Sequence, residues 1–311
     1  MGLSSGVLRP AIIKIAHHSW VRRIATQSSI GRAVATRFVA GETLAEALGV
    51  ARDLADDGLT SMLNHLGENV ETMRDALAAR ETYLAEVAAV RSHPALDLVV
   101  SIKLTQLGLD ESVEACWANV EPILDAAAEA EIDVMIDIEE HTTVDATLTV
   151  FARGHAHYPR AGIALQAYLS RTPDDLFELP DGCRVRLVKG AYLEPHHIVV
   201  GGKREVDRAF RRLFTTAFER GHRVDVATHD PEIIDGVRER VDEAPDGWER
   251  VEFEMLYGVR RDLQGELARK GYPVRVYIPY GTEWYPYLTR RMAERPANLW
   301  FFASNLTRTA R

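Results

Sequence analysis

Short apolar runs alternate with longer amphipathic segments along most of the chain. The runs are rich in Val, Ile and Leu and end at Gly, Pro or charged residues, which is typical of strands buried in a parallel sheet. The segments between them have the spacing of helices that cover such a sheet. We predict seven or eight strands, within residues 59–68, 96–104, 132–140, 162–168, 183–192, 222–230, 251–258 and 273–279.

Helices are predicted between these strands and before the first of them. They cover residues from about 11 to 57, 71–90, 110–131, from 142 onward, a short segment after Pro173, 203–221, from Pro231 onward and from about Glu283 onward. This alternation predicts a parallel α/β architecture. The pattern alone does not separate a closed barrel from an open doubly wound sheet. No GxGxxG motif follows a strand, however, which disfavours the open dinucleotide-binding sheet.

Composition and charge narrow the class of protein. The chain has 311 residues, 46% of them hydrophobic and 27% charged, which suits one (β/α) barrel with a large core and extra helices. A net charge of −9 argues against nucleic acid as a partner. The two cysteines, Cys116 and Cys183, form no CxxC motif. We therefore expect a reducing compartment, without a disulfide framework or a cysteine-rich metal site.

The sequence does not predict a membrane-spanning helix, because no apolar run reaches about 18 residues. The first ~25 residues contain a short apolar segment, AIIKIA, between basic residues. The segment is too short for a secretory signal. It is either a helix that docks on the fold or a basic amphipathic helix at a membrane surface. We expect a cytoplasmic protein, and peripheral binding at the inner face of the membrane stays open.

A strand, a Pro-x-Gly turn and a helix follow one another in residues 273–294. On that helix Tyr287, Arg290, Arg291 and Glu294 are spaced by three, four and seven residues, so they share one face. An aromatic ring beside two guanidinium groups suits a small carboxylate with an apolar body. The alternative is an exposed helix with an internal ion pair.

Most of the residues at the carboxyl ends of the predicted strands are charged or polar. In (β/α) barrels the active site lies at these ends. Any one of the residues could be a satisfied ion pair or a solvated strand end, but several on one face predict a site. They are Lys103, Asp137, Gln166, Arg186, Lys189, Thr228, His229, Glu254, Leu256 and Tyr277.

The last segment, RVYIPYGTEWYPYLTRRMAER, resembles the end of the catalytic domain in the proline dehydrogenase family, where an RRxxE helix closes the barrel. The motifs RLVKGAY and ATHD match the same family in the same order, and the resemblance covers roughly residues 58 to 305. It implies a (β/α)8 TIM-like barrel, distorted, with extra N-terminal helices. It divides the chain into a helical region, 1–57, packed on an FAD-binding catalytic barrel, 58–311, as a single domain overall.

The implied activity is oxidation of L-proline to Δ1-pyrroline-5-carboxylate by hydride transfer to FAD, the first step of proline catabolism. The family usually passes its electrons to a membrane quinone. No aldehyde dehydrogenase module follows, so a separate pyrroline-5-carboxylate dehydrogenase is expected for the second oxidation. Two other function classes stay open: a Schiff-base aldolase barrel with Lys103 or Lys189 as nucleophile, and a non-catalytic imino-acid-binding module.

The resemblance also assigns cofactor-binding residues. Gly190 would permit close approach of the cofactor, and Arg186 and Lys189 would offer positive charge to the reduced flavin or the pyrophosphate. Some family members have glutamine in place of Glu254; this carboxylate would disfavour an anionic flavin or is salt-bridged, for example to Lys189. The cofactor set is Ile138, Gln166, Arg186, Val188, Lys189, Gly190, Ala191, Tyr192, Thr228, His229, Glu254 and Glu294.

Substrate contacts are implied on the opposite side of the barrel mouth. Arg290 and Arg291 would hold the proline carboxylate with help from Lys103, and Glu294 would orient one of the arginines or reach a flavin hydroxyl. Asp137 would pair with Lys103 or an arginine, and with Arg186 it forms the expected catalytic pair. The residues expected to pack on the pyrrolidine ring are Leu256, Tyr277 and Tyr287.

Overall fold

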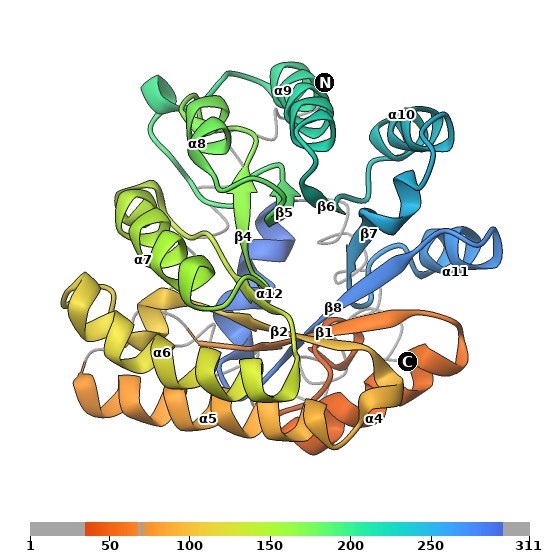
Figure 1. Ribbon diagram of the computed structural model, residues 1–311. Helices are drawn as coiled ribbons and strands as arrows, with labels where there is room; N and C mark the ends of the chain where they lie inside the picture. Colours follow the sequence, from red (N-terminus) through yellow and green to blue (C-terminus); the bar gives the residue numbers. More distant parts are fainter. Residues whose placement is uncertain (1–34, 68–69, 71, 295–311) are drawn as a thin grey trace, which may run out of the picture.

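Eight parallel strands close into a barrel in which each strand pairs with the next and the last pairs with the first (Figure 1). The computed structural model describes residues 35–67, 70 and 72–294, with the backbone alone for 290–294. The predicted (β/α)8 barrel is confirmed, and the open sheet is excluded. The strands are β1 (Thr60–His65), β2 (Leu98–Ile102), β3 (Val134–Ile136), β4 (Ala161–Gln166), β5 (Arg184–Val188), β6 (Arg223–Ala227), β7 (Val251–Leu256) and β8 (Val274–Tyr280).

Helices surround the barrel and connect its strands. In the described part of the chain they are α4 (Leu44–Asp56), α5 (Met73–Arg91), α6 (Val113–Ala130), α7 (Val144–His157), α8 (Thr172–Glu178), α9 (Lys203–Glu219), α10 (Pro231–Asp242), α11 (Arg261–Arg269) and α12 (Trp284–Glu294). No described helix is both long enough and apolar enough to cross a membrane.

The strands are apolar runs because both of their faces are covered. Every residue of β2 and β4 is buried, between the barrel interior and the ring of helices. A parallel strand in this position has no solvent-facing side, so its sequence is nearly continuous in apolar residues. This explains why the predicted strand positions agree with the structure.

Two helix predictions were wrong. The expected helix from about 11 to 57 is interrupted in its described part, because Gly41 has a φ of +115° and Thr43 forms a capping box with Glu46 that starts α4 afresh. The residues before 35 lie outside the described part of the chain. The prediction omitted α11, a helix of 9 residues whose N-cap, Arg260, makes no side-chain cap bond.

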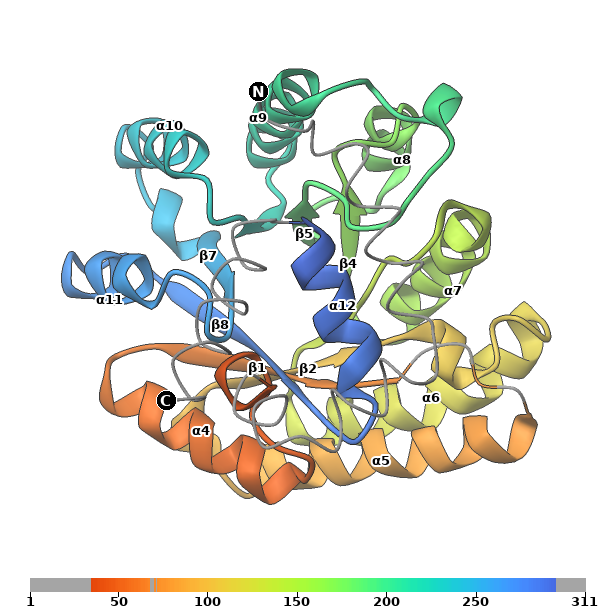
Figure 2. The same cartoon turned by 180° about the vertical axis from the view of Figure 1, so that it is seen from behind.

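The two helices at the ends of the described chain have unusual places. The first, α4, packs outside the barrel against β1 and β8. The last, α12, instead lies across one end of the barrel (Figure 2). Its residue Tyr287 lines a cavity at the carboxyl ends of the strands. The helix on which the sequence analysis placed a carboxylate receptor is therefore positioned over the barrel mouth.

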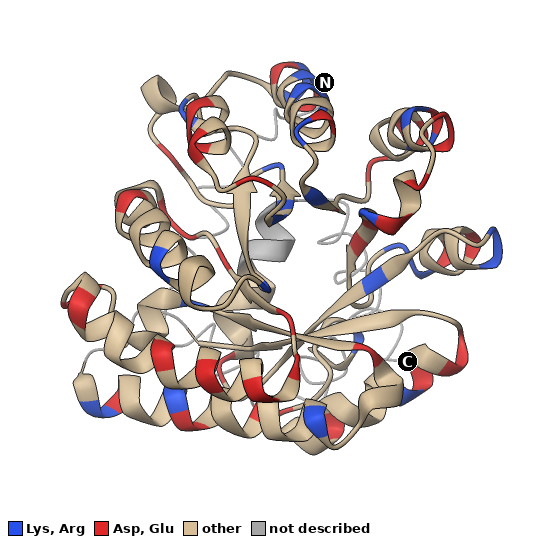
Figure 3. Ribbon diagram, in the orientation of Figure 1, with Lys and Arg blue, Asp and Glu red and all other residues tan. Residues whose placement is uncertain are grey.

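Charged residues of both signs lie on the barrel strands as well as on the outer helices (Figure 3). In the amino-terminal half of the barrel, Arg184 bonds to Asp225 at 2.8 Å and to Asp133 at 2.7 Å, and it also contacts Glu252. Arg275 bonds to Glu252 at 2.7 Å. We call these five residues the lower layer.

Candidate functional site

A cavity of about 580 Å³ lies at the carboxyl ends of the strands. Every predicted site residue whose side chain the structure describes lines it. These are Lys103, Asp137, Ile138, Gln166, Arg186, Val188, Lys189, Gly190, Ala191, Tyr192, Thr228, His229, Glu254, Leu256, Tyr277 and Tyr287. The side chains of the other three, Arg290, Arg291 and Glu294, lie outside the described part of the chain, although their backbone belongs to α12.

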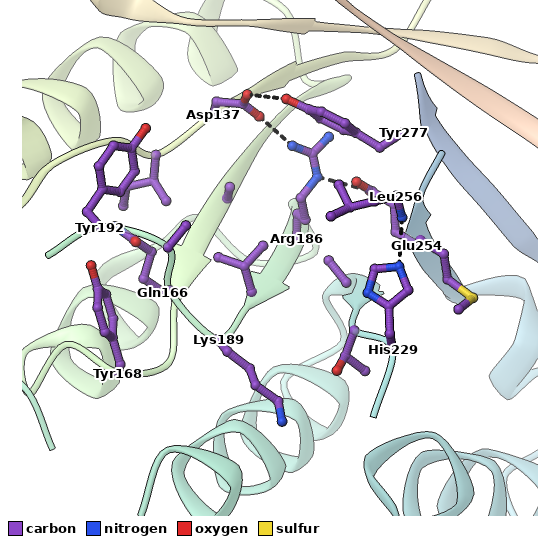
Figure 4. A pocket seen from close by; sticks show the side chains of 18 of the residues that line it. Asp137, Gln166, Tyr168, Arg186, Lys189, Tyr192, His229, Glu254, Leu256 and Tyr277 are labelled. Atoms are coloured by element: carbon purple, nitrogen blue, oxygen red, sulfur yellow. Dashed lines mark hydrogen bonds and ion pairs between the residues drawn. The ribbon is translucent and has the colours of Figure 1, made fainter. Parts of the chain in front are cut away.

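Asp137 and Arg186 form the centre of the cavity floor (Figure 4). Asp137 follows β3, and its Oδ1 accepts a hydrogen bond from Arg186 and another, at 2.8 Å, from Ser101 Oγ. Its Oδ2 accepts from the hydroxyl of Tyr277 at 2.8 Å. Burial alone would raise the pKa of Asp137, but Lys103, Arg186 and these hydrogen bonds lower it to about 2. The carboxylate is therefore a fixed anion.

Lys103 follows β2 and points into the same centre. Its Nζ lies 3.0 Å from Asp137 Oδ2, contacts Asn64 Oδ1 and lies 3.4 Å from the Tyr277 hydroxyl. Asn64, on β1, was not predicted; its sequence signal is a polar residue near the carboxyl end of an apolar strand. The ammonium group is thus held by groups from three other strands or strand ends.

Glu254 pairs with Arg186, at 2.9 Å between Oε2 and Nε, and not with Lys189 as the sequence analysis suggested. The suggestion was wrong because Arg186 and Glu254 point inward from β5 and β7, whereas Lys189 lies beyond the end of β5. Burial raises the pKa of Glu254 to about 7, against the attraction of Arg186. Arg186 is thus shared by two carboxylates, Asp137 and Glu254, and does not present a surplus of positive charge.

Lys189 is also shared by two carboxylates. Its Nζ lies 2.5 Å from Asp207 on α9 and 2.7 Å from Asp230, the N-cap of α10. Lys203 bridges the same two carboxylates from the first residue of α9. Asp230 is the last residue of the ATHD motif, but no pattern in the sequence pointed to Asp207. Two cations and two anions therefore line this side of the cavity.

Three predicted residues are fixed by bonds to the loops around them. Gln166, at the end of β4, donates from Nε2 to the carbonyl of Glu139 at 2.9 Å. The backbone N–H of Leu256 donates to Nε2 of His229 at 3.0 Å, so the proton of the neutral ring is on Nδ1. The hydroxyl of Thr228 accepts from the Asp230 backbone N–H at 3.2 Å.

Gly190 is required by a protein contact. Its φ is +117°, and a Cβ at this position would lie 2.2 Å from the ring of Tyr168. Tyr168, which was not predicted, lines the cavity and packs over this glycine. The backbone at Gly190 therefore approaches an aromatic wall of the cavity, and a side chain there would displace that wall.

Apolar residues line the cavity on the side of β7, β8 and β1. Leu256 and Tyr277 come from strands, and Tyr287 comes from α12. The sequence analysis missed three further lining residues on this side, Phe38, Leu66 and Val259. Leu66 and Val259 lie in segments between elements, where apolar periodicity gives no signal. Phe38 ends a helical turn, residues 35–38, and its sequence gives no sign that it reaches the barrel mouth.

These features define a class of protein: a (β/α)8 barrel with a charged, part-enclosed chamber at the carboxyl ends of its strands, where barrel enzymes hold their active sites. A structure of proline utilization A from Bdellovibrio bacteriovorus, inactivated by N-propargylglycine, superposes with a TM-score of 0.78 at 23% identity. The match covers 92% of this chain and 36% of that one, so this chain spans about a third of its length.

Sequence comparison goes further than fold. The family model for proline dehydrogenase matches residues 47–304. Proline dehydrogenase from Deinococcus radiodurans is 37% identical over 304 residues, 96% of this chain and 97% of that protein. Proline dehydrogenase 1 from Bacillus subtilis subsp. natto is 37% identical over 268 residues, 86% of this chain and 88% of that protein. The chain belongs to the proline dehydrogenase family.

Proposed function

We propose that this chain oxidises L-proline to Δ1-pyrroline-5-carboxylate, the first step of proline catabolism, with FAD as its cofactor. The C–H bond next to the ring nitrogen breaks, the nitrogen lone pair forms the C=N bond, and the amine proton is lost. FAD, when bound, supplies the hydride acceptor. One observation carries this proposal: in a chain of the proline dehydrogenase family, a single cavity is lined by Lys103, Asp137, Arg186 and Tyr277.

The residues on the β5 and β6 side fit a cofactor with a flat polar ring and a pyrophosphate. Arg186 and Gln166 offer hydrogen-bonding groups from the cavity floor and wall. Gly201 and Gly202 line the cavity beside the first turn of α9, and Gly202, its N-cap, makes no side-chain cap bond. A helix start of this kind exposes backbone N–H groups suited to phosphate oxygens. Lys203 adds a cation there.

The residues on the opposite side fit the substrate. Lys103 provides a cation for the carboxylate, and we assign Arg290 and Arg291 to the same carboxylate from α12. Leu256, Tyr277 and Tyr287 supply an apolar wall for the pyrrolidine ring, and Glu294 orients the arginines.

Asp137 and Arg186 act by holding this geometry. Asp137 fixes the Lys103 ammonium and the Tyr277 hydroxyl at 3.0 and 2.8 Å. Arg186 holds a guanidinium group in the wall of the cavity, where fixed charge beside bound substrate and cofactor would stabilise a transition state without reorganisation. Accurate positioning of substrate against acceptor supplies a further large part of the acceleration.

The aldolase alternative needs a neutral lysine, and both candidates are paired. Lys103 is bonded to Asp137, and Lys189 to Asp207 and Asp230. A Schiff-base lysine attacks as an unpaired amine, whereas carboxylates hold both of these side chains. The proposal also includes a membrane quinone as electron acceptor, reached by peripheral contact with the membrane. A separate dehydrogenase would oxidise the product.

The test is a spectrum of the purified protein under anaerobic conditions. We expect flavin absorbance that bleaches when L-proline is added. Arg291→Ala should keep the flavin and require a much higher L-proline concentration for the same bleaching. A colourless protein that is trapped on a lysine by borohydride with a carbonyl substrate would contradict the proposal. Proline binding without bleaching would support the binding module instead.

A further inference from the structure

The chain segment before α4 is tied to the barrel mouth. The backbone N–H of Ala40 donates to the carbonyl of Pro279 on β8 at 2.8 Å, and the N–H of Gly281 donates to the carbonyl of Gly41 at 3.0 Å. We call residues 35–41 the strap. Because Gly281 lies in the turn that leads into α12, the strap is joined to the strand and to the turn that place this helix.

The strap also contacts the loop after β7 more closely than a side chain would permit. Gly258 has a φ of +76°, and a Cβ built on it would lie 1.8 Å from the backbone oxygen of Arg37. Any other residue at 258 would push the strap backbone outward. The position of the strap thus depends on a glycine about 220 residues further along the chain.

This arrangement places the ring of Phe38 in the cavity wall. Phe38 is buried, with 8% of its surface exposed, and it lines the cavity. It belongs to a small apolar cluster, separate from the main core, that joins the strap to α12 and to the segment after β1. The cluster contains Ala35, Phe38, Val39, Leu66, Trp284, Tyr285, Tyr287 and Leu288.

The cluster lies on the substrate side of the cavity. Strands β7, β8, β1 and β2 are contiguous in the closed barrel, and they or their ends carry Leu256, Tyr277 and Lys103. Lys189, at the end of β5, and the start of α9 lie on the other side of the barrel. Phe38 and Tyr287 are therefore in the same wall.

We propose that Phe38 is a specificity-determining residue, which limits the size of the ring that the cavity accepts, and that the strap positions both Phe38 and α12. The inference rests on the proposed oxidation of proline and extends it to the choice among cyclic imino acids. A pocket discriminates against an added methylene only if its wall is fixed, and the strap bonds and the Gly258 contact fix this one.

The primary experiment compares L-proline with its six-membered homologue, L-pipecolate. Phe38→Ala should lower the ratio of kcat/KM for L-proline to kcat/KM for L-pipecolate by about tenfold or more, because the vacated space admits the extra methylene. Phe38→Leu should shift the ratio less and keep the cluster packed. Flavin content should match the wild type in both variants, and thermal unfolding shows that each is folded.

A second pair of variants tests the strap at two positions that do not themselves line the cavity. Gly258→Ala should shift the ratio in the same direction as Phe38→Ala, because it displaces Arg37 and with it Phe38. Gly58→Ala is the matched control, since Gly58 has the same φ of +76° but nothing within 4 Å of its Cβ position. Both substitutions carry the same backbone strain, so a difference between them reports the contact with the strap.

Unchanged selectivity in both Phe38 variants, in a wild-type protein that oxidises L-proline, would overturn the inference and leave the proposed function standing. Equal selectivity in Gly258→Ala and Gly58→Ala would overturn the positioning role of the strap. A wild-type protein with bound flavin and no oxidation of L-proline would overturn the proposed function, and the inference with it.

Discussion

Two arginines on strand β5, Arg184 and Arg186, are both paired with buried carboxylates, but they lie at different heights in the barrel. Both are buried, with 5% and 3% of their surface exposed. Burial disfavours the charge of each, but neighbouring carboxylates raise the pKa of both guanidinium groups above the ordinary value. Arg184 belongs to the lower layer, and Arg186 belongs to an upper layer with Lys103, Asp137, Glu254 and Tyr277.

The difference is access to the cavity. Every residue of the upper layer lines the cavity, and no residue of the lower layer does. In the lower layer, Arg275 also donates to the carbonyls of Ser61 and Asp97, so the network ends on the backbone. Ion pairing and burial therefore do not identify a functional site in this barrel. What separates the two roles is position along the strands: pairs at the carboxyl ends face the site, and pairs nearer the amino ends are structural.

The largest effect on stability is expected at Arg184. Replacing it by Met would leave Asp225 buried without the arginine that pairs with it and would remove one partner each from Asp133 and Glu252. Breaking a buried pair in this way lowers the free energy of unfolding by about 3–5 kcal/mol. Urea denaturation followed by circular dichroism measures this loss. A loss below about 1 kcal/mol would show that the lower layer is not a structural network.

Arg186→Met should mainly affect activity. Removing one fixed charge from a transition-state site lowers turnover by about 10²–10³-fold. Stability should fall less than in Arg184→Met, since the cavity can hydrate the orphaned carboxylates of Asp137 and Glu254. Oxidation of L-proline with a dye acceptor, corrected for flavin content, gives the first quantity, and urea denaturation gives the second.

The matched pair of arginine variants distinguishes the two layers. The two arginines are two residues apart on the same strand, and methionine replaces each of them. If Arg186→Met lost as much stability as Arg184→Met and kept its turnover per flavin, the upper layer would be a second structural network.

Local sequence predicts much of the fold and many of the residues that line the site. The barrel strands are apolar runs, and the residues at their carboxyl ends meet at one mouth because all strands are parallel. Lys103, Asp137 and Arg186 were placed in this way. The period of two within a strand also puts Arg184 and Arg186 on one face.

The partners within the site do not follow from local sequence. Glu254 pairs with Arg186 from a strand that is not adjacent to β5, and only the closed barrel brings them within 2.9 Å. Phe38 enters the cavity because the strap runs past Gly258 and β8, which no periodicity predicts. The pairing of Lys189 with Asp207 likewise depends on how α9 docks against the end of β5.

The smallest expected effect concerns two glutamates on β7, Glu252 and Glu254, whose pKa values move in opposite directions. Burial alone would raise the pKa of Glu252, but Arg275 and Arg184 lower it to about 2, whereas burial raises the pKa of Glu254 to about 7. Glu252 therefore contributes stability that is present above pH ~4.5 and is lost as pH falls through about 2. Glu254 reduces stability progressively as pH rises from ~4.5 to about 7.

The glutamine variants of these residues separate the two cases. Relative to wild type, Glu254→Gln should gain up to about 3 kcal/mol of unfolding free energy between pH 4.5 and 7, with no further gain above pH 7. Glu252→Gln should show no such gain, because Glu252 is ionised in the folded and unfolded states over most of this range. Urea denaturation at closely spaced pH values measures both differences. Parallel curves for the two variants would contradict the opposite pKa shifts of Glu252 and Glu254 and the distinction that they draw between the two layers.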